Sequence, residues 1–302
     1  MAASIRLTGI VELGYLITQY AGTSWWLHQN NIPHQIHLNP CHDVWFPWCD
    51  ESQFEFNKPN SVYKTLINGK LWKQKPFTLN NHWSHKISYY EADFDPYEVY
   101  KTWSPPPYQK IFKEKNSLEL PEKPVLLITN QFNLESGANR KPQNYYSIAF
   151  LDTIIKLLGD KYEIWYSRPI GNEIGYSDDG IVGASFTDFA LIEKFKNRGI
   201  AIRTVTDFME ETKLGYNEVL LRMLALSDKI LCVAGGNACL ASYFGKECII
   251  YINPESYFYK KGAPKRHLWY NGTWLDKLND ENSVFGYDSL DEIHNVCRER
   301  WL

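Results

Sequence analysis

The sequence contains no apolar run of the length that crosses a bilayer, and neither sign of charge is in excess. Its 302 residues include 32 basic and 35 acidic side chains, so no overall field attracts nucleic acid or an anionic membrane. The first residues also lack the basic segment and apolar stretch of a secretion signal. We therefore expect a cytoplasmic protein with no membrane span and no nucleic-acid partner, whose oligomeric state the sequence does not reveal.

Cysteine is sparse, and its positions do not suggest a metal site. Three of the six cysteines, Cys232, Cys239 and Cys248, lie in an apolar segment where cysteine acts as a small buried hydrophobe. Cys41, His42 and Cys49 are close in sequence, but their spacing matches no common zinc motif. We expect reduced thiols and no bound metal.

The segment from Ser227 to Ile252 carries the strongest functional signal. Two apolar runs, 230–233 and 248–252, predict parallel strands buried on both faces. Gly235 and Gly236 between them can adopt backbone angles closed to other residues, and they place no side chain in the way of a ligand. A helix over 237–244 would begin there with unpaired N–H groups. We predict that Gly235, Gly236 and Asn237 bind phosphate; the alternative is an ordinary crossover turn.

The rest of the chain divides into two α/β regions on either side of a proline-rich passage, Ser104 to Pro124. The first region predicts strands over 5–10 and 34–38 around a helix over 15–29, followed by an irregular, aromatic-rich stretch. The second alternates strands over 125–129, 162–167 and 200–205 with helices over 147–158, 192–197 and 217–226. This alternation predicts a doubly wound parallel sheet.

Three segments resemble a known family. Leu226 to Gly245 resembles the nucleotide-lobe signature of GT-B glycosyltransferases. Glu12 to Gly22, ELGYLITQYAG, is similar to the opening of fucosyltransferase-like members, and Asn144 to Ala149 resembles the helix start after their donor-binding arginine motif. Those enzymes carry His-x-Arg where this chain has Ile128 to Gln131, which leaves the nucleotide and the sugar open.

The resemblance implies a GT-B-like fold: two Rossmann-like lobes with a cleft between them. It implies an acceptor-side domain over residues 1–115, a nucleotide-sugar-binding domain over 116–285, and a helix over 286–302 that packs at the lobe junction. The implied activity is metal-independent transfer of a sugar from a nucleotide donor, a GDP- or UDP-sugar, to a glycan acceptor, without a cofactor. An inactive glycan- or nucleotide-binding protein and a sugar-nucleotide epimerase are the alternatives.

A transferase must stabilise the charge on the departing nucleoside diphosphate. Arg168, directly after strand 162–167, is the first candidate, because a guanidinium fits phosphate with paired hydrogen bonds. Arg140 and Lys141 are the second candidates. The alternative for any of these is a solvated side chain or an ion pair, and we expect the basic loop over 260–266 to be a solvated face.

An inverting reaction also needs a general base for the acceptor hydroxyl. Glu12 follows the first strand, although a carboxylate there could instead stabilise a helix N-terminus. His42 with Asp43 is the next candidate, because a carboxylate can orient an imidazole; His82 and His85 follow. A retaining reaction would need none of them as a base.

Aromatic residues are abundant, with 11 Trp, 20 Tyr and 15 Phe, and tryptophan concentrates before residue 104. Flat rings bind the apolar faces of sugars, and indole N–H groups bond to hydroxyls. Trp45, Trp48 and Trp83 are therefore our candidates for the acceptor site. The alternative is that they fill the core of an irregular lobe.

Overall fold

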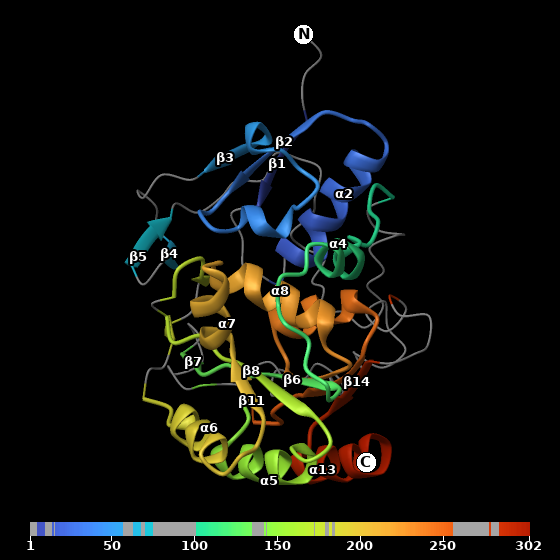
Figure 1. Cartoon of the computed structure of the whole chain (residues 1–302). Coiled ribbons are helices and arrows are strands. Elements are labelled where there is room, and N and C mark those ends of the chain that lie inside the picture. The colour runs from blue at the N-terminus through green and yellow to red at the C-terminus, as the bar shows by residue number, and fades with distance from the viewer. Residues whose placement is uncertain are drawn as a thin grey trace.

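The computed structural model describes residues 5–9, 14, 16–56, 63–67, 70–74, 101–134, 142, 144–171, 173–178, 181–182, 185–255, 278 and 284–302. These residues form two α/β units, one stacked on the other (Figure 1). Each unit contains a parallel sheet, so the predicted α/β class is confirmed.

The N-terminal unit is built on a sheet with the order β1-β2-β3, in which both pairs of neighbours are parallel. Its strands are β1 (Ile5–Gly9), β2 (His34–Leu38) and β3 (Phe54–Phe56). The helix expected over 15–29 begins as a π-helix, η1 (Leu16–Ala21), and continues as α2 (Gly22–Gln29). Two short 3-10 helices, η2 (Asp43–Trp45) and η3 (Glu51–Gln53), lie between β2 and β3.

A second, antiparallel sheet links the two units. The hairpin of β4 (Tyr63–Ile67) and β5 (Lys70–Gln74) pairs with β9 (Ser177–Asp178) through β4. The other small pair is β7 (Asn133–Leu134) with β10 (Ile181–Val182). Loops of the C-terminal unit therefore contact a hairpin that comes from the first third of the chain.

The C-terminal unit contains a six-stranded parallel sheet with the order β11-β8-β6-β12-β13-β14. Its strands are β6 (Val125–Thr129), β8 (Glu163–Ser167), β11 (Ile202–Thr204), β12 (Lys229–Val233), β13 (Glu247–Tyr251) and β14 (Val284–Tyr287). Numbered along the chain, this order is 3-2-1-4-5-6, which is the order of the Rossmann fold.

Helices cover both faces of this sheet, because alternate residues of each strand enter different cores. In β6, Val125 and Leu127 join one core, and Leu126 and Ile128 join the other. The first core contains residues of α7 (Val205–Thr212), α8 (Tyr216–Leu226), α9 (Gly236–Ala241) and η4 (Ser242–Phe244). The second contains residues of α5 (Ile148–Leu158), α6 (Asp188–Lys196) and α13 (Leu290–Trp301).

The N-terminal unit rests on the layer of α8, α9 and η4 (Figure 1), and the two units share one hydrophobic core. Helix α4 (Tyr108–Glu114) lies between them, in the passage where the sequence indicated only a connector. Its Tyr108 hydroxyl donates to the Trp45 carbonyl at 2.7 Å, and its Gln109 amide donates to the Ala225 carbonyl at 3.0 Å. The junction is therefore packed and hydrogen-bonded on both sides of α4.

The C-terminal helix corrects one expectation, because α13 does not lie at the junction of the units. Its buried residues Ile293, Cys297 and Trp301 recur at every fourth position and join the core shared with α5. That core is on the sheet face opposite the N-terminal unit (Figure 1). The apolar stripe of α13 thus covers the outer face of the sheet. The boundaries at residues 115 and 285 stay predictions.

Candidate functional site

The strand order of the C-terminal sheet reverses between β6 and β12. From β6 the chain proceeds to β8 and β11 on one side, whereas from β12 it proceeds to β13 and β14 on the other. The connecting helices also diverge, because α5 after β6 and α9 after β12 cover opposite faces. Open α/β sheets bind ligands outside the carboxyl ends of the strands at such a point. The carboxyl ends of β6 and β12 therefore define the candidate site.

At the carboxyl end of β12, the chain turns through the predicted glycine pair. Gly235 has φ 148° and ψ −164°, a conformation that residues with a side chain rarely adopt, and no side chain caps the helix that begins after it. Residues 235–237 are half-buried, whereas Ala234 and Ala238 on either side are buried. The structure thus places Gly235, Gly236 and Asn237 at the switch point with partial access to solvent; phosphate binding by them stays a prediction.

Gln131 lies against this turn from the end of β6. Its Nε2 donates to the carbonyl of Ala234 at 3.3 Å, and a Cβ built on Gly235 would lie 3.4 Å from its Oε1. The side-chain amide therefore brings a hydrogen-bonding group to the glycine turn. No motif in the sequence pointed to Gln131, which lies in the segment where the chain departs from the fucosyltransferase-like pattern.

Asn130 fixes the backbone from which Gln131 projects. It is fully buried, and its Oδ1 accepts from the backbone N–H of Gln131 at 3.0 Å and of Tyr146 at 2.8 Å. Its Nδ2 donates to the Tyr146 carbonyl at 3.3 Å and to the Tyr166 hydroxyl at 3.1 Å. One side chain thus ties the end of β6 to the segment that enters α5.

Arg168 does not face a phosphate site directly, which corrects the role predicted for it. Its side chain is 1% exposed and bonds to Asp188 through two nitrogens, with Nε to Oδ2 at 2.5 Å and Nη2 to Oδ1 at 2.7 Å. It also donates to the carbonyls of Pro169 and Phe186, and the Tyr166 hydroxyl donates to Asp188 as well. The ion pair that was the alternative for this arginine is the structure observed.

The loop that carries His42 and Asp43 follows the carboxyl end of β2 and contacts the C-terminal unit. Asn217 at the beginning of α8 donates to the carbonyl of Cys41 at 3.4 Å. The beginning of α8 lies at the carboxyl edge of the large sheet, because the Tyr216 hydroxyl is 2.7 Å from Ser167 Oγ at the end of β8. The His42 loop therefore approaches the edge of the sheet at which the switch point lies.

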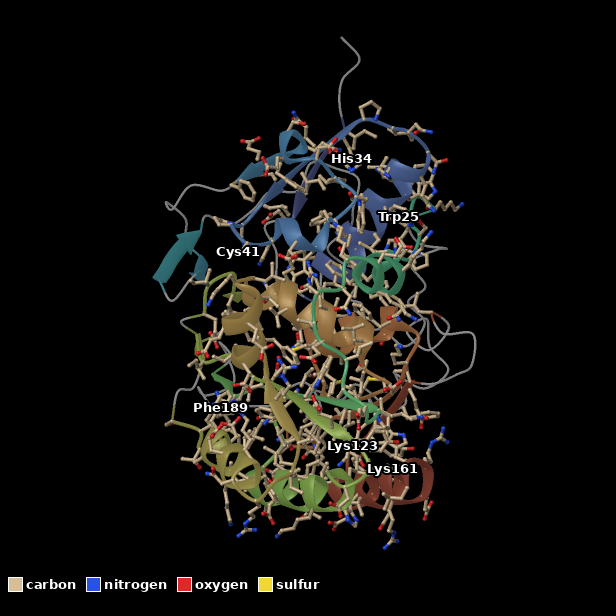
Figure 2. The ribbon with its side chains drawn as sticks, in the orientation of Figure 1. Trp25, His34, Cys41, Lys123, Lys161 and Phe189 are labelled. Carbon is tan, nitrogen blue, oxygen red and sulfur yellow. The ribbon has the colours of Figure 1, made fainter. Side chains whose placement is uncertain are left out.

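Figure 2 shows on which side of the lower unit the carboxyl ends of its strands lie. Lys123 and Lys161 precede β6 and β8, and they lie on the right of the lower unit in Figure 2. Phe189, at the beginning of α6, lies on its left, and Cys41 lies above it on that side. The amino ends of the strands thus point one way, and the carboxyl ends point toward the side on which Cys41 lies.

Of the two predicted residues in this loop, Asp43 has the better access to solvent. His42 is 3% exposed, whereas Asp43 is exposed. Desolvation by its surroundings raises the pKa of the Asp43 carboxyl, and the negative charges of Glu218 and Glu51 raise it further, against a lowering by a backbone hydrogen bond. A carboxyl with a raised pKa is a better proton acceptor than an ordinary one.

The acceptor role predicted for Trp45 is wrong. Its side chain is 1% exposed and lies in the core shared by the two units, so it has no ring face open to a sugar. Trp48 is half-buried, and its Nε1 donates to Ser24 Oγ at 3.0 Å while its ring contacts Trp25 and Tyr108. The alternative that the aromatic residues fill the core is therefore correct for Trp45.

Several predicted site residues lie outside the described residues. They are Glu12, Trp83, Arg140, Lys141, His82 and His85. The basic residues over 260–266, which we expect to be a solvated face, also lie outside them: Lys260, Lys261, Lys265 and Arg266. Their roles stay predictions.

All six cysteines are free thiols. Cys49 lies 3.5 Å from Ser24 Oγ and 3.8 Å from His34 Nε2. Among the residues that the structure describes, no three His, Cys, Asp or Glu side chains gather as metal ligands would. Within those same residues, no helix has both the length and the apolar character needed to span a bilayer.

No family model matches this chain, and no curated protein matches it significantly. Among solved structures, it is similar to the ADP-heptose LPS heptosyltransferase II of E. coli, with 10% identity over 84% of this chain and 86% of that chain, and a TM-score of 0.43. It is also similar to the wall teichoic acid polymerase TagF, with 12% identity over 72% of this chain and 38% of that chain, and a TM-score of 0.27.

A variant of TagF soaked with CDPG has 11% identity over 82% of this chain and 69% of that chain, and a TM-score of 0.32. The fold class rests on the strand order and the helix layers described above.

Proposed function

We propose that this protein is a glycosyltransferase that moves a sugar from a nucleotide-sugar donor to a carbohydrate acceptor without a metal ion. The observation that carries the proposal is the glycine turn at the switch point of a sheet with Rossmann order. A second α/β unit packs on the first, as expected for an enzyme that binds a donor and an acceptor on different units.

The diphosphate of the donor would bind at the turn of Gly235, Gly236 and Asn237. Backbone N–H groups there would stabilise the negative charge that develops on the leaving diphosphate. The Gln131 amide, held beside the turn through the Ala234 carbonyl, would donate to a phosphate oxygen. Arg140 and Lys141 remain the candidate cations, since Arg168 forms an ion pair with Asp188.

The acceptor hydroxyl would need a base only in an inverting reaction. Asp43 is the described candidate, because it is exposed and its pKa is raised by desolvation first and by Glu218 and Glu51 second. Glu12, which follows β1 in the sequence, is the other candidate. His42 would require a rearrangement of its buried side chain before it could reach an acceptor.

A second candidate function is a nucleotide- or glycan-binding protein that performs no transfer. The pairing of Arg168 with Asp188 favours it, because the cation predicted to neutralise the leaving group is used within the fold. Binding alone would need the glycine turn and Gln131 but no base. Hydrolysis or transfer of a bound donor distinguishes the two functions.

The proposal is tested by titrating the protein with UDP, GDP, ADP and dTDP in a thermal unfolding assay and by calorimetry. A ligand at 100 times its Kd adds about 2.7 kcal/mol to the free energy of unfolding. We expect at least one nucleotide to bind, and Gln131→Ala to weaken that binding about tenfold or more, since hydrogen bonds to charged groups contribute about 1.5–3 kcal/mol.

Gln109→Ala is the matched control. Gln109 also donates from its side-chain amide to an alanine carbonyl, that of Ala225 at 3.0 Å, but it lies on α4 and away from the switch point. We expect Gln109→Ala to leave the Kd for the nucleotide unchanged. The absence of any stabilisation by the four nucleotides, or equal weakening by the two variants, would refute the proposal.

A further inference from the structure

Three aromatic rings from the segments that follow β6 and β8 meet one another. Phe132 directly follows Gln131, Tyr145 precedes α5, and Phe186 precedes α6. The rings of Phe132 and Phe186 are stacked, with centroids 4.4 Å apart and planes 13° apart. Tyr145 meets both edge-on, at 5.0 Å from Phe132 and 5.7 Å from Phe186. Residues far apart in the sequence thus form one compact aromatic group, which we call the aromatic trio.

The aromatic trio is not part of either hydrophobic core. Phe132, Tyr145 and Phe186 belong to neither of the two core clusters of the described residues, nor to the partly buried residues packed against them. All three are half-buried, so each ring keeps some contact with solvent. Rings that only filled the fold would be expected to join a core. A partly exposed aromatic group at a ligand-binding edge fits a stacking surface better.

Buried polar contacts hold the aromatic trio in place. Asn130 bonds to the backbone N–H of Gln131 at 3.0 Å and of Tyr146 at 2.8 Å, which fixes the chain next to Phe132 and next to Tyr145. Phe186 is fixed by Arg168, whose Nη2 donates to its carbonyl at 3.4 Å and whose guanidinium lies 5.6 Å from its ring centroid. The rings are therefore positioned before any ligand arrives, which lowers the entropy cost of binding.

Arg168 and Phe132 both lie against the ring of Phe186. Of the three rings, Phe132 is the one next in sequence to Gln131, whose side chain contacts the glycine turn. Phe132 is therefore the member of the trio that the chain connects most directly to the glycine turn.

We infer that Phe132, supported by Tyr145 and Phe186, is the stacking surface for the nucleobase of a nucleoside diphosphate whose phosphates lie at Gly235. This inference rests on the proposed function and deepens it by assigning the base subsite. Stacking on an aromatic ring is available to every base, because each has a π face. The surface therefore supplies affinity, while the choice among bases would come from polar groups around it.

The test compares nucleoside diphosphate with inorganic pyrophosphate, which lacks the base. Each is titrated by calorimetry into the unmodified protein, Phe132→Leu and Phe132→Trp, using whichever of UDP, GDP, ADP and dTDP the unmodified protein binds most tightly. We expect Phe132→Leu to weaken nucleotide binding about fivefold to 150-fold, which is the effect of losing one stacking contact. Pyrophosphate affinity should stay unchanged, and Phe132→Trp should retain nucleotide affinity.

Phe285→Leu is the matched control, because Phe285 is also half-buried and lies 4.7 Å from a guanidinium, that of Arg300, but on β14 at the sheet edge. We expect it to change neither affinity. Nucleotide affinity that is the same in Phe132→Leu and the unmodified protein overturns the base subsite and leaves the proposed function standing. If Phe132→Leu weakens the binding of nucleotide and of pyrophosphate equally, the base subsite is also overturned, because the ring would then affect the binding of the phosphates. If the unmodified protein binds no nucleotide, both the subsite and the proposed function fail.

Discussion

Removing the charge of Arg168 should destabilise the fold strongly, because the change leaves a buried carboxylate without its partner. Asp188 is fully buried and accepts two bonds from Arg168, at 2.5 and 2.7 Å. The Tyr166 hydroxyl would be its remaining donor among the contacts described above. Breaking one side of a buried ion pair costs about 3–5 kcal/mol, since the surviving charge is desolvated and uncompensated. Arg168→Met, which keeps much of the volume, should therefore lower the free energy of unfolding by about that amount.

Arg203→Met provides the matched control for this substitution. Arg203 pairs with Glu211 and lies 3.9 Å from the ring centroid of Phe208, so it has both kinds of partner that Arg168 has. Its side chain is 22% exposed and that of Glu211 is 55% exposed, so solvent screens the pair. Exposed pairs contribute about 0.2–1 kcal/mol. We expect Arg203→Met to lower the free energy of unfolding by no more than that.

The assay is urea unfolding of both variants, followed by circular dichroism. The double variant Arg168→Met/Asp188→Asn should be more stable than Arg168→Met alone, because it removes the unpaired charge. If Arg168→Met lowers the free energy of unfolding no more than Arg203→Met does, the buried ion pair does not have the predicted effect on stability. The absence of any rescue by Asp188→Asn would show that the loss is one of packing instead of charge.

Two further predictions concern the N-terminal unit. Gly22→Ala would place a Cβ in the space of the Trp103 ring, whose Nε1 donates to the Thr18 carbonyl. We expect the free energy of unfolding, measured with urea, to fall by about 1–3 kcal/mol. An unchanged unfolding midpoint would contradict this packing. Asp43→Asn should raise the melting temperature at pH 7, because the raised pKa of Asp43 means that its charged form costs stability at high pH. The gain in melting temperature should disappear as the pH falls below about 3.9, the ordinary pKa of an aspartate carboxyl. A gain that stays constant with pH would contradict the raised pKa of Asp43.

The regular elements of the C-terminal unit could be predicted because their apolar runs are local signals. The strand over 125–129 was predicted with its observed limits, and the helix over 217–226 begins one residue earlier in the structure. Helix α4 was missed because it has only two buried residues, Tyr108 and Phe112, directly after a run of prolines. It is stabilised by contacts with distant residues such as Phe244, whose ring stacks on Tyr108. Such tertiary contacts leave no periodic pattern in the sequence.

The candidate site was predictable in its backbone and less so in its side chains. Gly235 and Gly236 were identified because a glycine pair between two apolar runs can turn the chain sharply and places no side chain in the way of a ligand. The sequence placed Arg168 correctly at a strand end, but it could not show that Asp188, 20 residues later, would bind it. The stacking partner of Phe132 lies beyond a whole βα unit, at Phe186, so its role depends on strand order that only the fold reveals.

The central claim is that a nucleoside diphosphate binds at the glycine turn. A crystal structure of the protein with the nucleoside diphosphate that stabilises it most would test this claim directly. We expect diphosphate density within hydrogen-bonding distance of the backbone N–H groups of Gly235, Gly236 or Asn237, beside the Gln131 amide. Density for the ligand elsewhere on the molecule, with none at the glycine turn, would contradict this mode of binding.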